Sequence, residues 1–93
     1  MSLLTSEEIN NWMKELSGWQ FHNNEIGKEF QFKDFPEALS FVNKVGEFAE
    51  EMNHHPDIFL HSWNKVNITL STHDKGGVTE KDFQLAKKIN ELL

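Results

Sequence analysis

The sequence contains no cysteine, which excludes disulfide bridges, thiolate catalysis and cysteine-rich zinc sites together. It also contains no arginine, because all nine basic residues are lysines. The planar guanidinium that binds a phosphate or a guanine edge through two hydrogen bonds is therefore missing. The net charge of −6 leads to the same conclusion, since nucleic-acid binding needs a basic surface that displaces counterions. We therefore expect no direct binding of nucleic acid.

Long apolar segments are absent as well. No apolar run approaches the length of a membrane span, and the first ten residues lack the basic and apolar regions of a secretory signal. These absences predict a cytoplasmic protein that does not bind a membrane. The fractions that are present, 38% hydrophobic and 26% charged residues, are typical of a folded domain. A chain of 93 residues has room for one small core, so we expect a single domain over residues 1–93 that forms oligomers.

Capping signals predict three helices. The capping pairs are Thr5 with Glu8, Asp34 with Glu37, and Thr79 with Asp82. In each pair the first side chain can accept a hydrogen bond from a backbone amide of the first helical turn. Pro36 suits the first turn of the central helix, where no amide hydrogen is needed. The helices are expected over residues 6–16, 35–52 and 80–93.

Alternation of polar and apolar residues predicts four strands, over residues 19–24, 28–33, 57–63 and 66–72. We interpret residues 23–27 as the first turn and residues 64–65 as the second. Short connections between consecutive strands imply an antiparallel sheet. The order helix–strand–strand–helix–strand–strand–helix then predicts an α+β two-layer sandwich, with the helices on one face of a four-stranded sheet.

Phe41 and Phe48 make the apolar arc of the central helix unusually wide. Together with the residues at core spacing, they extend it to about half of the helix circumference. The simpler interpretation is that both side chains belong to the core. The alternative is that they form the rim of a contact between subunits.

Three of the five histidines lie where a functional site could form. Imidazole titrates near neutral pH and therefore suits general acid–base catalysis. His54 and His55 follow the central helix, and Pro56 biases His55 towards an extended backbone, which makes the two rings diverge. His73 lies at the expected end of the fourth strand, where functional groups are often displayed. These side chains could flank one small ligand, and the alternative is that the pair is exposed polar surface.

A metal site is a further alternative. Its candidate ligands would be His54, His55, His73 and either Glu50 or Asp74. Adjacent histidines seldom both reach one ion, and neither an HExxH motif nor a cysteine pair is present. The spacing therefore favours acid–base chemistry over metal binding.

Four other residues receive structural interpretations from their local pattern. His22 and His61 lie inside strand patterns and are expected to be exposed strand histidines. Trp63 could stack on a planar heterocycle, but an aromatic residue in a strand more often packs against its neighbours. Asp82 could act in catalysis, yet its place in a capping box explains it without a ligand. We therefore favour a structural role for Asp82.

Residues 50–82 read EEMNHHPDIFLHSWNKVNITLSTHDKGGVTEKD and combine an acidic residue, a His-His-Pro triplet, an aromatic residue, a further histidine and an aspartate. In this order and spacing the segment resembles the pterin-4a-carbinolamine dehydratase family. The matching positions are Glu50, His54, His55, Pro56, Trp63, His73 and Asp82. Residues 30–42, FQFKDFPEALSFV, support the resemblance in the first half of the chain. A set of seven positions is far more specific than a lone histidine pair.

The resemblance implies a hydro-lyase that dehydrates 4a-hydroxytetrahydropterin to quinonoid dihydropterin. This reaction recycles the cofactor of aromatic amino-acid hydroxylases. The resemblance implies no metal and no bound cofactor, because the pterin is the substrate, and it implies a homodimer or homotetramer. The alternative from another class is a protein-interaction module, similar to a transcriptional dimerisation cofactor, with a secondary or relic pterin site.

The same resemblance implies that the catalytic residues are His54, His55 and His73. We expect His54 and His73 to transfer the protons and His55 mainly to hold the pterin. The implied substrate contacts are Asn53, His54, His55, Ser71, Thr72, His73 and Asp74. The implied supporting residues are Glu50, Pro56, Trp63 and Asp82.

Overall fold

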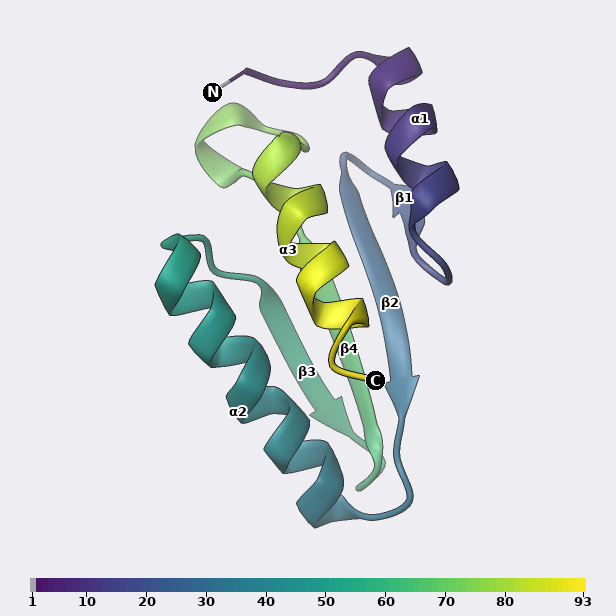
Figure 1. The fold of residues 1–93 in the computed structure, drawn as a ribbon, viewed down its shortest axis with the longest axis vertical. Coiled ribbons are helices and arrows are strands. Elements are labelled where there is room, and N and C mark those ends of the chain that lie inside the picture. Colours follow the sequence, from purple (N-terminus) through teal and green to yellow (C-terminus); the bar gives the residue numbers. More distant parts are fainter. Residues whose placement is uncertain (1) are drawn as a thin grey trace.

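The computed structural model describes residues 2–93, which form helices packed on one face of a sheet (Figure 1). Along the chain the elements are α1 (Ser6–Glu15), β1 (Gln20–His22), β2 (Glu25–Gln31), α2 (Phe35–Met52), β3 (Asp57–His61), β4 (Lys65–Leu70), a short 3-10 helix η1 (His73–Lys75) and α3 (Glu80–Asn90). The strands lie in the order β1-β2-β4-β3, and all neighbours are antiparallel. This arrangement confirms the predicted α+β fold and its order of elements.

The sheet face beneath the helices carries the core. In the register of β2 and β4, Ile26 lies opposite Leu70 and Phe30 lies opposite Val66, and all four are buried. The buried apolar residues that α2 and α3 add are Ala38, Phe41, Val45, Ala49, Phe83, Leu85, Ala86 and Ile89. The opposite face, here called the helix-free face, carries Gln20, His22, Glu29, Phe59, His61, Asn67 and Thr69, because side chains alternate along each strand.

Helix caps fix the ends of the segments that matter for the site. α2 ends at Asn53, whose left-handed backbone (φ 50°) is one that asparagine tolerates. α3 begins at the predicted capping box of Thr79 and Asp82. Figure 1 shows the end of α2 and the start of α3 at the same end of the molecule. The chain that follows Asn53 therefore starts close to the first turn of α3.

The first hairpin turn is shorter than predicted. Only Asn23 and Asn24 adopt left-handed backbone angles (φ 52° and 63°), and Glu25 already pairs with His22. Two residues of this kind suffice for a tight hairpin whose twist matches that of its strands. The expected turn over residues 23–27 was therefore wrong in its second half, where Ile26 lies in β2 and is buried.

The second hairpin turn also differs from the prediction. β3 ends at His61, and Ser62 and Trp63 form the turn with left-handed angles (φ 50° and 58°). Asn64 is buried and donates a hydrogen bond from its side chain to the backbone oxygen of Phe32 at 2.8 Å, which anchors this turn. Trp63 is 62% exposed, so the expectation that it packs within a strand was wrong.

Phe41 belongs to the core. It is 5% exposed, and its ring centroid lies 4.8 Å from that of Phe30 and 4.9 Å from that of Phe32. Phe48 is half-buried and packs against the same core. The simpler interpretation is confirmed for Phe41, and a role at a subunit rim is wrong for this residue.

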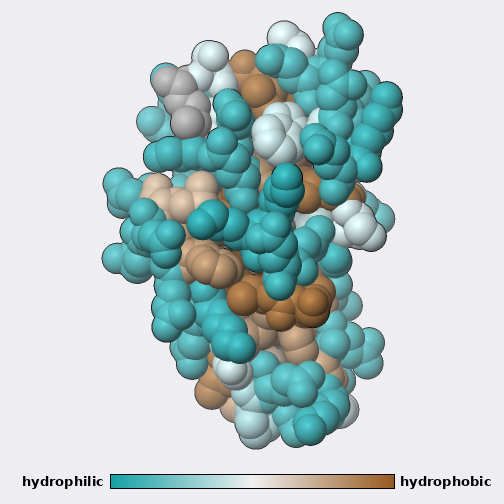
Figure 2. Space-filling model, in the orientation of Figure 1, coloured by the Kyte–Doolittle hydropathy of each residue, from teal (hydrophilic) through white to brown (hydrophobic). Residues whose placement is uncertain are grey.

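The surface formed by the helices is mostly hydrophilic, with apolar surface gathered near the C-terminal end of α3 (Figure 2). A hollow there is lined in part by Phe32, Phe41, Leu92 and Leu93. Within residues 2–93, no helix is both long enough and apolar enough to cross a membrane.

Candidate active site

His54 is placed by the cap that ends α2. Its backbone amide donates to the oxygen of Ala49 at 3.0 Å, while Asn53 turns the chain away from the helix axis. Pro56 follows and leads into β3. The imidazole of His54 is 10% exposed, so this ring is directed into the protein rather than into solvent.

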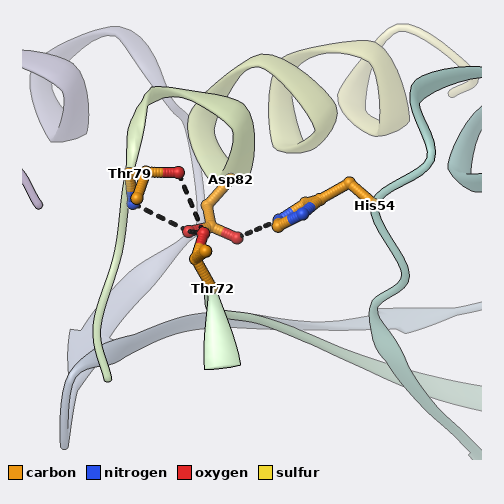
Figure 3. A network of polar contacts seen from close by, with 4 residues as sticks. All are labelled: His54, Thr72, Thr79 and Asp82. Carbon is orange, nitrogen blue, oxygen red and sulfur yellow. Dashed lines mark hydrogen bonds and ion pairs between the residues drawn. The ribbon is translucent and has the colours of Figure 1, made fainter. Parts of the chain in front are cut away.

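Asp82 is the centre of the network that receives this ring. Its carboxylate is fully buried in the first turn of α3. Oδ2 accepts hydrogen bonds from the amide of Thr79 at 2.8 Å and the hydroxyl of Thr72 at 2.9 Å, and Oδ1 lies 2.5 Å from Nε2 of His54. Figure 3 shows these three residues converging on Asp82 from different segments. A buried carboxylate without donors would be strongly destabilising, and here three donors and the start of a helix satisfy it.

The carboxylate of Asp82 also anchors the segment that carries His73. Thr72 follows β4, and its amide donates to the oxygen of Gly77 at 2.7 Å across a short loop. His73 comes next and opens η1, with an exposed side chain. Asp82 therefore joins two histidine-bearing segments, one containing His54 and the other His73.

His55 lies in different surroundings. Its Nε2 is 2.5 Å from Oε2 of Glu50, and the two side chains are 59% and 79% exposed. The buried ring of His54 and the exposed ring of His55 agree with the divergence that Pro56 led us to expect. The pair does not form one closed pocket.

The remaining predicted residues are divided between two places. Asn53 is exposed beside the histidine pair, while Ser71 (half-buried) and Asp74 (exposed) flank Thr72 and His73. Trp63, by contrast, lies in the β3–β4 turn, at the opposite end of β3 from the histidine pair (Figure 1). The structure thus brings the two predicted contact segments onto one network and leaves Trp63 away from it.

The two strand histidines lie on the helix-free face. His22 is exposed, as predicted. His61 is 25% exposed, stacks on Phe59 with ring centroids 4.8 Å apart, and places Nε2 3.0 Å from Oε2 of Glu29. The prediction of an exposed His61 was therefore wrong, because a carboxylate on β2 and an aromatic ring on its own strand cover it.

Other polar groups of the chain lie outside this network. Burial lowers the pKa of Lys28, whose ammonium donates to the backbone oxygen of Ser17 at 2.9 Å and to Oδ1 of Asn90 at 3.0 Å.

A hollow of about 350 Å³ lies around Gly27 on the helix-free face, and none of the three candidate histidines lines it. In the part of the chain that the structure describes, no three histidine, aspartate or glutamate side chains are grouped as metal ligands.

Two features of the network were not predicted. Asp82 was assigned a structural role, and it fills that role while also contacting His54. Thr79 was predicted only as a cap, yet its hydroxyl lies 2.9 Å from that of Thr72. A threonine at each end of a loop of six residues was a signal for this contact, but only the fold shows that both face one carboxylate.

The arrangement is suited to proton transfer. A carboxylate that contacts one ring nitrogen of a histidine orients the ring and balances the charge that it gains on protonation. The other ring nitrogen of His54 remains available to a ligand. Together with the exposed His73, the site holds two imidazoles, a side chain that can serve either as proton donor or as proton acceptor.

Relatives from several organisms carry the same name. The family model described as pterin 4 alpha carbinolamine dehydratase matches residues 2–92. A protein of Sulfolobus acidocaldarius, named "Putative pterin-4-alpha-carbinolamine dehydratase", is 49% identical over 89 residues, which cover 96% of this chain and 97% of that protein. A protein of Sulfurisphaera tokodaii with the same name is 50% identical over 93 residues, covering 100% of this chain and 99% of its own.

Solved structures with the same fold carry related descriptions. The crystal structure of a transcriptional coactivator/pterin dehydratase from Brucella melitensis has a TM-score of 0.91 and 40% identity, covering 96% of each chain. A pterin dehydratase-like protein described as a RuBisCO assembly factor in the alpha-carboxysome has a TM-score of 0.64 and 24% identity over 80% of this chain, a likeness of fold alone. Because the family model and the curated relatives match almost the whole length, this chain belongs to the pterin 4 alpha carbinolamine dehydratase family.

Proposed function

We propose that this chain dehydrates a 4a-hydroxytetrahydropterin to a quinonoid dihydropterin and water by histidine general acid–base catalysis. The observation that carries the proposal is the contact between His54 and the buried carboxylate of Asp82, beside the segment that bears His73. The names of the relatives supply the substrate class. The network supplies imidazole groups, which can donate or accept a proton.

The reaction needs one acid and one base. A proton must reach the 4a-oxygen so that the C4a–O bond can break and water can leave. A second proton must leave N5, and its bonding electrons then form the C4a–N5 double bond. No net proton is consumed, because the acid loses one proton and the base gains one. Before the next turnover the base must release its proton and the acid must regain one, by exchange with solvent.

We assign the two proton transfers to His54 and His73, and the holding of the pterin mainly to His55. The burial of His54 and its contact with a carboxylate support its part, because the ring is held in one orientation. His73 is exposed on a segment fixed by the same carboxylate. His55 and Glu50 are both exposed, so the side chain of His55 is free to move to fit a ligand. Further contacts are expected from Asn53, Ser71, Thr72 and Asp74.

The same proposal extends to the setting of the reaction. An aromatic amino-acid hydroxylase would produce the 4a-hydroxy compound, and this protein would return the pterin for reduction. We expect the protein to act in the cytoplasm as a homodimer or homotetramer.

The test is stopped-flow absorbance of the decay of the 4a-hydroxy compound, generated by a phenylalanine hydroxylase, with and without this protein. We expect the protein to accelerate the decay, and His54→Ala and His73→Ala each to lower kcat by about 100-fold, the scale of one lost acid or base. His22→Ala is the matched control, because His22 is exposed on the helix-free face.

Each outcome has a clear meaning. No acceleration by the folded wild-type protein would overturn the proposed activity. Acceleration that survives in His54→Ala and His73→Ala would keep the activity and overturn the site. Circular dichroism of each variant separates loss of chemistry from loss of fold.

A further inference from the structure

Two threonine hydroxyls lie behind the carboxylate that contacts His54. Thr72 follows β4 and is half-buried, whereas Thr79 caps α3 and is fully buried. The loop between them is closed by the bond from the amide of Thr72 to Gly77. Their hydroxyl oxygens are 2.9 Å apart, and neither needs a ligand to explain its position.

The directions of the hydrogen bonds follow from counting hydrogens. A hydroxyl has one hydrogen, and an ionised carboxylate can only accept. Thr72 donates its hydrogen to Oδ2 of Asp82, so the hydroxyl of Thr79 must donate to that of Thr72. Oδ2 also accepts from the amide of Thr79. Two donors therefore hold Oδ2, and Oδ1 alone faces His54.

This chain of donors has a consequence for the imidazole. Because Oδ1 of Asp82 can only accept, the ring of His54 must carry a hydrogen on Nε2. In the neutral ring, Nδ1 is then the nitrogen without a hydrogen and the one that can take a proton. Among residues 2–93, Nδ1 has no hydrogen-bond partner, and no unpartnered side-chain nitrogen or oxygen is buried. Nδ1 is therefore not completely buried.

We propose that Thr72 is a positioning residue, whose hydroxyl holds Asp82 so that His54 stays in the Nε2–H tautomer and presents Nδ1 as the proton acceptor. This inference rests on the proposed function only for its effect on turnover. It gives the hydroxyl of Thr72 a role in addition to the substrate contact that is expected of this residue. The hydroxyl of Thr72 is already engaged on both sides, as acceptor from Thr79 and as donor to Asp82.

The tautomer can be read without any enzymatic assay. In long-range ¹H–¹⁵N NMR of ¹⁵N-labelled protein, protonated and unprotonated ring nitrogens have separate shifts, and the His54→Gln spectrum assigns the His54 signals. At a pH where the ring is neutral, we expect wild-type His54 to be protonated at Nε2 alone. Protonation at Nδ1 in the wild type would overturn the proposal, and this result needs no variant to fold.

The variants then test Thr72 itself. Thr72→Val removes the donor at nearly unchanged volume, Thr72→Ser keeps it, and Thr69→Val is a matched control because Thr69 lies on the helix-free face, outside the network. In Thr72→Val one donor instead of two holds Oδ2, so the carboxylate can rotate and turn Oδ1 away from Nε2 of His54. We therefore expect mixed tautomers of His54 in Thr72→Val and the wild-type tautomer in the other two. A pure Nε2–H tautomer in folded Thr72→Val would overturn the role of Thr72. If that variant does not fold, Thr79→Val, which removes the upstream donor, is expected to shift the tautomer in the same direction, and an unchanged tautomer there counts against the proposal.

Kinetics separate this inference from the proposed activity. We expect Thr72→Val to lower kcat by about tenfold, the effect of one lost hydrogen bond to a charged group, and Thr72→Ser to restore it. The pH dependence of kcat/KM should change in Thr72→Val, which a merely structural defect would not produce. A mixed tautomer with unchanged kcat and pH profile would overturn the link from Thr72 to catalysis. The expected tautomers in a protein without dehydratase activity would support the positioning and overturn the proposed function.

Discussion

Two neighbouring histidines make the same contact in opposite surroundings. Nε2 of His54 lies 2.5 Å from a carboxylate oxygen of Asp82, and Nε2 of His55 lies 2.5 Å from one of Glu50. The side chains of the first pair are 10% and 0% exposed, and those of the second are 59% and 79% exposed. Distance alone therefore does not distinguish them. Their burial does.

The difference in burial decides what each pair contributes. Around Glu50 and His55, water screens the charges, and exposed pairs of this kind stabilise proteins little. Around Asp82, water is excluded, so loss of a partner leaves a buried charge or donor unsatisfied. Asp82 also has two further donors, whereas Glu50 has His55 alone among the side chains that the structure describes. We therefore expect both stability and chemistry to depend mainly on the buried pair.

The largest effect is expected from Asp82→Asn. An amide offers one acceptor and one donor in place of two acceptor oxygens. Two donors converge on Oδ2, so the amide oxygen should take that position and its NH₂ group should face His54. The ring would then turn to the Nδ1–H tautomer, which has no free acceptor for the substrate. We expect kcat to fall by roughly three to four orders of magnitude, as for the same change in a serine-protease triad.

Urea unfolding and stopped-flow assays measure the two effects of this change. The free energy of unfolding should fall by about 2 kcal/mol, the value for hydrogen bonds to a buried charged group. Glu80→Gln is the matched control, since Glu80 is an exposed carboxylate in the same first turn of α3. If Asp82→Asn behaved like Glu80→Gln, burial would not be what separates the two histidine pairs.

The fold could be predicted because its signals are local. The capping boxes at Thr5 and Thr79 and the cap at Asp34 mark helix starts within a few residues of sequence. Alternation of buried and half-buried residues along β4 marks the face of the sheet. Both kinds of signal depend on chain geometry over one or two turns, and the structure bears them out.

The turns were less predictable because two of them use residues other than glycine in left-handed conformations. Asn24 fits such a position through its short polar side chain. Tryptophan is not typical of a left-handed conformation, so Trp63 gave no sign of the second turn. The buried side chain of Asn64, which bonds the backbone of Phe32 on another segment, holds that turn in place. A contact of this kind depends on tertiary packing and leaves no local pattern.

The candidate site shows the same division. The family resemblance predicts His54, His73 and Asp82 as site residues, but the contact between His54 and Asp82 could not be read from the sequence. His54 and Asp82 are 28 residues apart, and their contact requires the start of α3 to pack beside the end of α2. The capping box explained Asp82 fully, so nothing local indicated a second partner.

A smaller effect is expected from Glu50→Gln. The change removes a charge from an exposed pair, so the free energy of unfolding should stay within about 0.5 kcal/mol of the wild type. If His55 holds the pterin, KM should rise by about threefold while kcat stays unchanged, because the ring loses a modest orienting contact. Steady-state dehydration kinetics measure both constants. A fall in kcat comparable to that of Asp82→Asn would show that catalysis depends on the exposed pair as much as on the buried pair.

The smallest effect on turnover is expected from Glu29→Gln, which breaks a third histidine–carboxylate pair. His61 and Glu29 are 25% and 47% exposed, intermediate between the other two pairs, but they lie on the helix-free face. Because the pair is only partly buried, its loss should lower the free energy of unfolding by less than about 1 kcal/mol. The position of the pair should decide its effect on catalysis, and we expect kcat and KM within about twofold of the wild type, since neither residue belongs to the proposed site. A clear loss of turnover would mean that the substrate reaches the helix-free face and that the site has been assigned to the wrong side of the sheet.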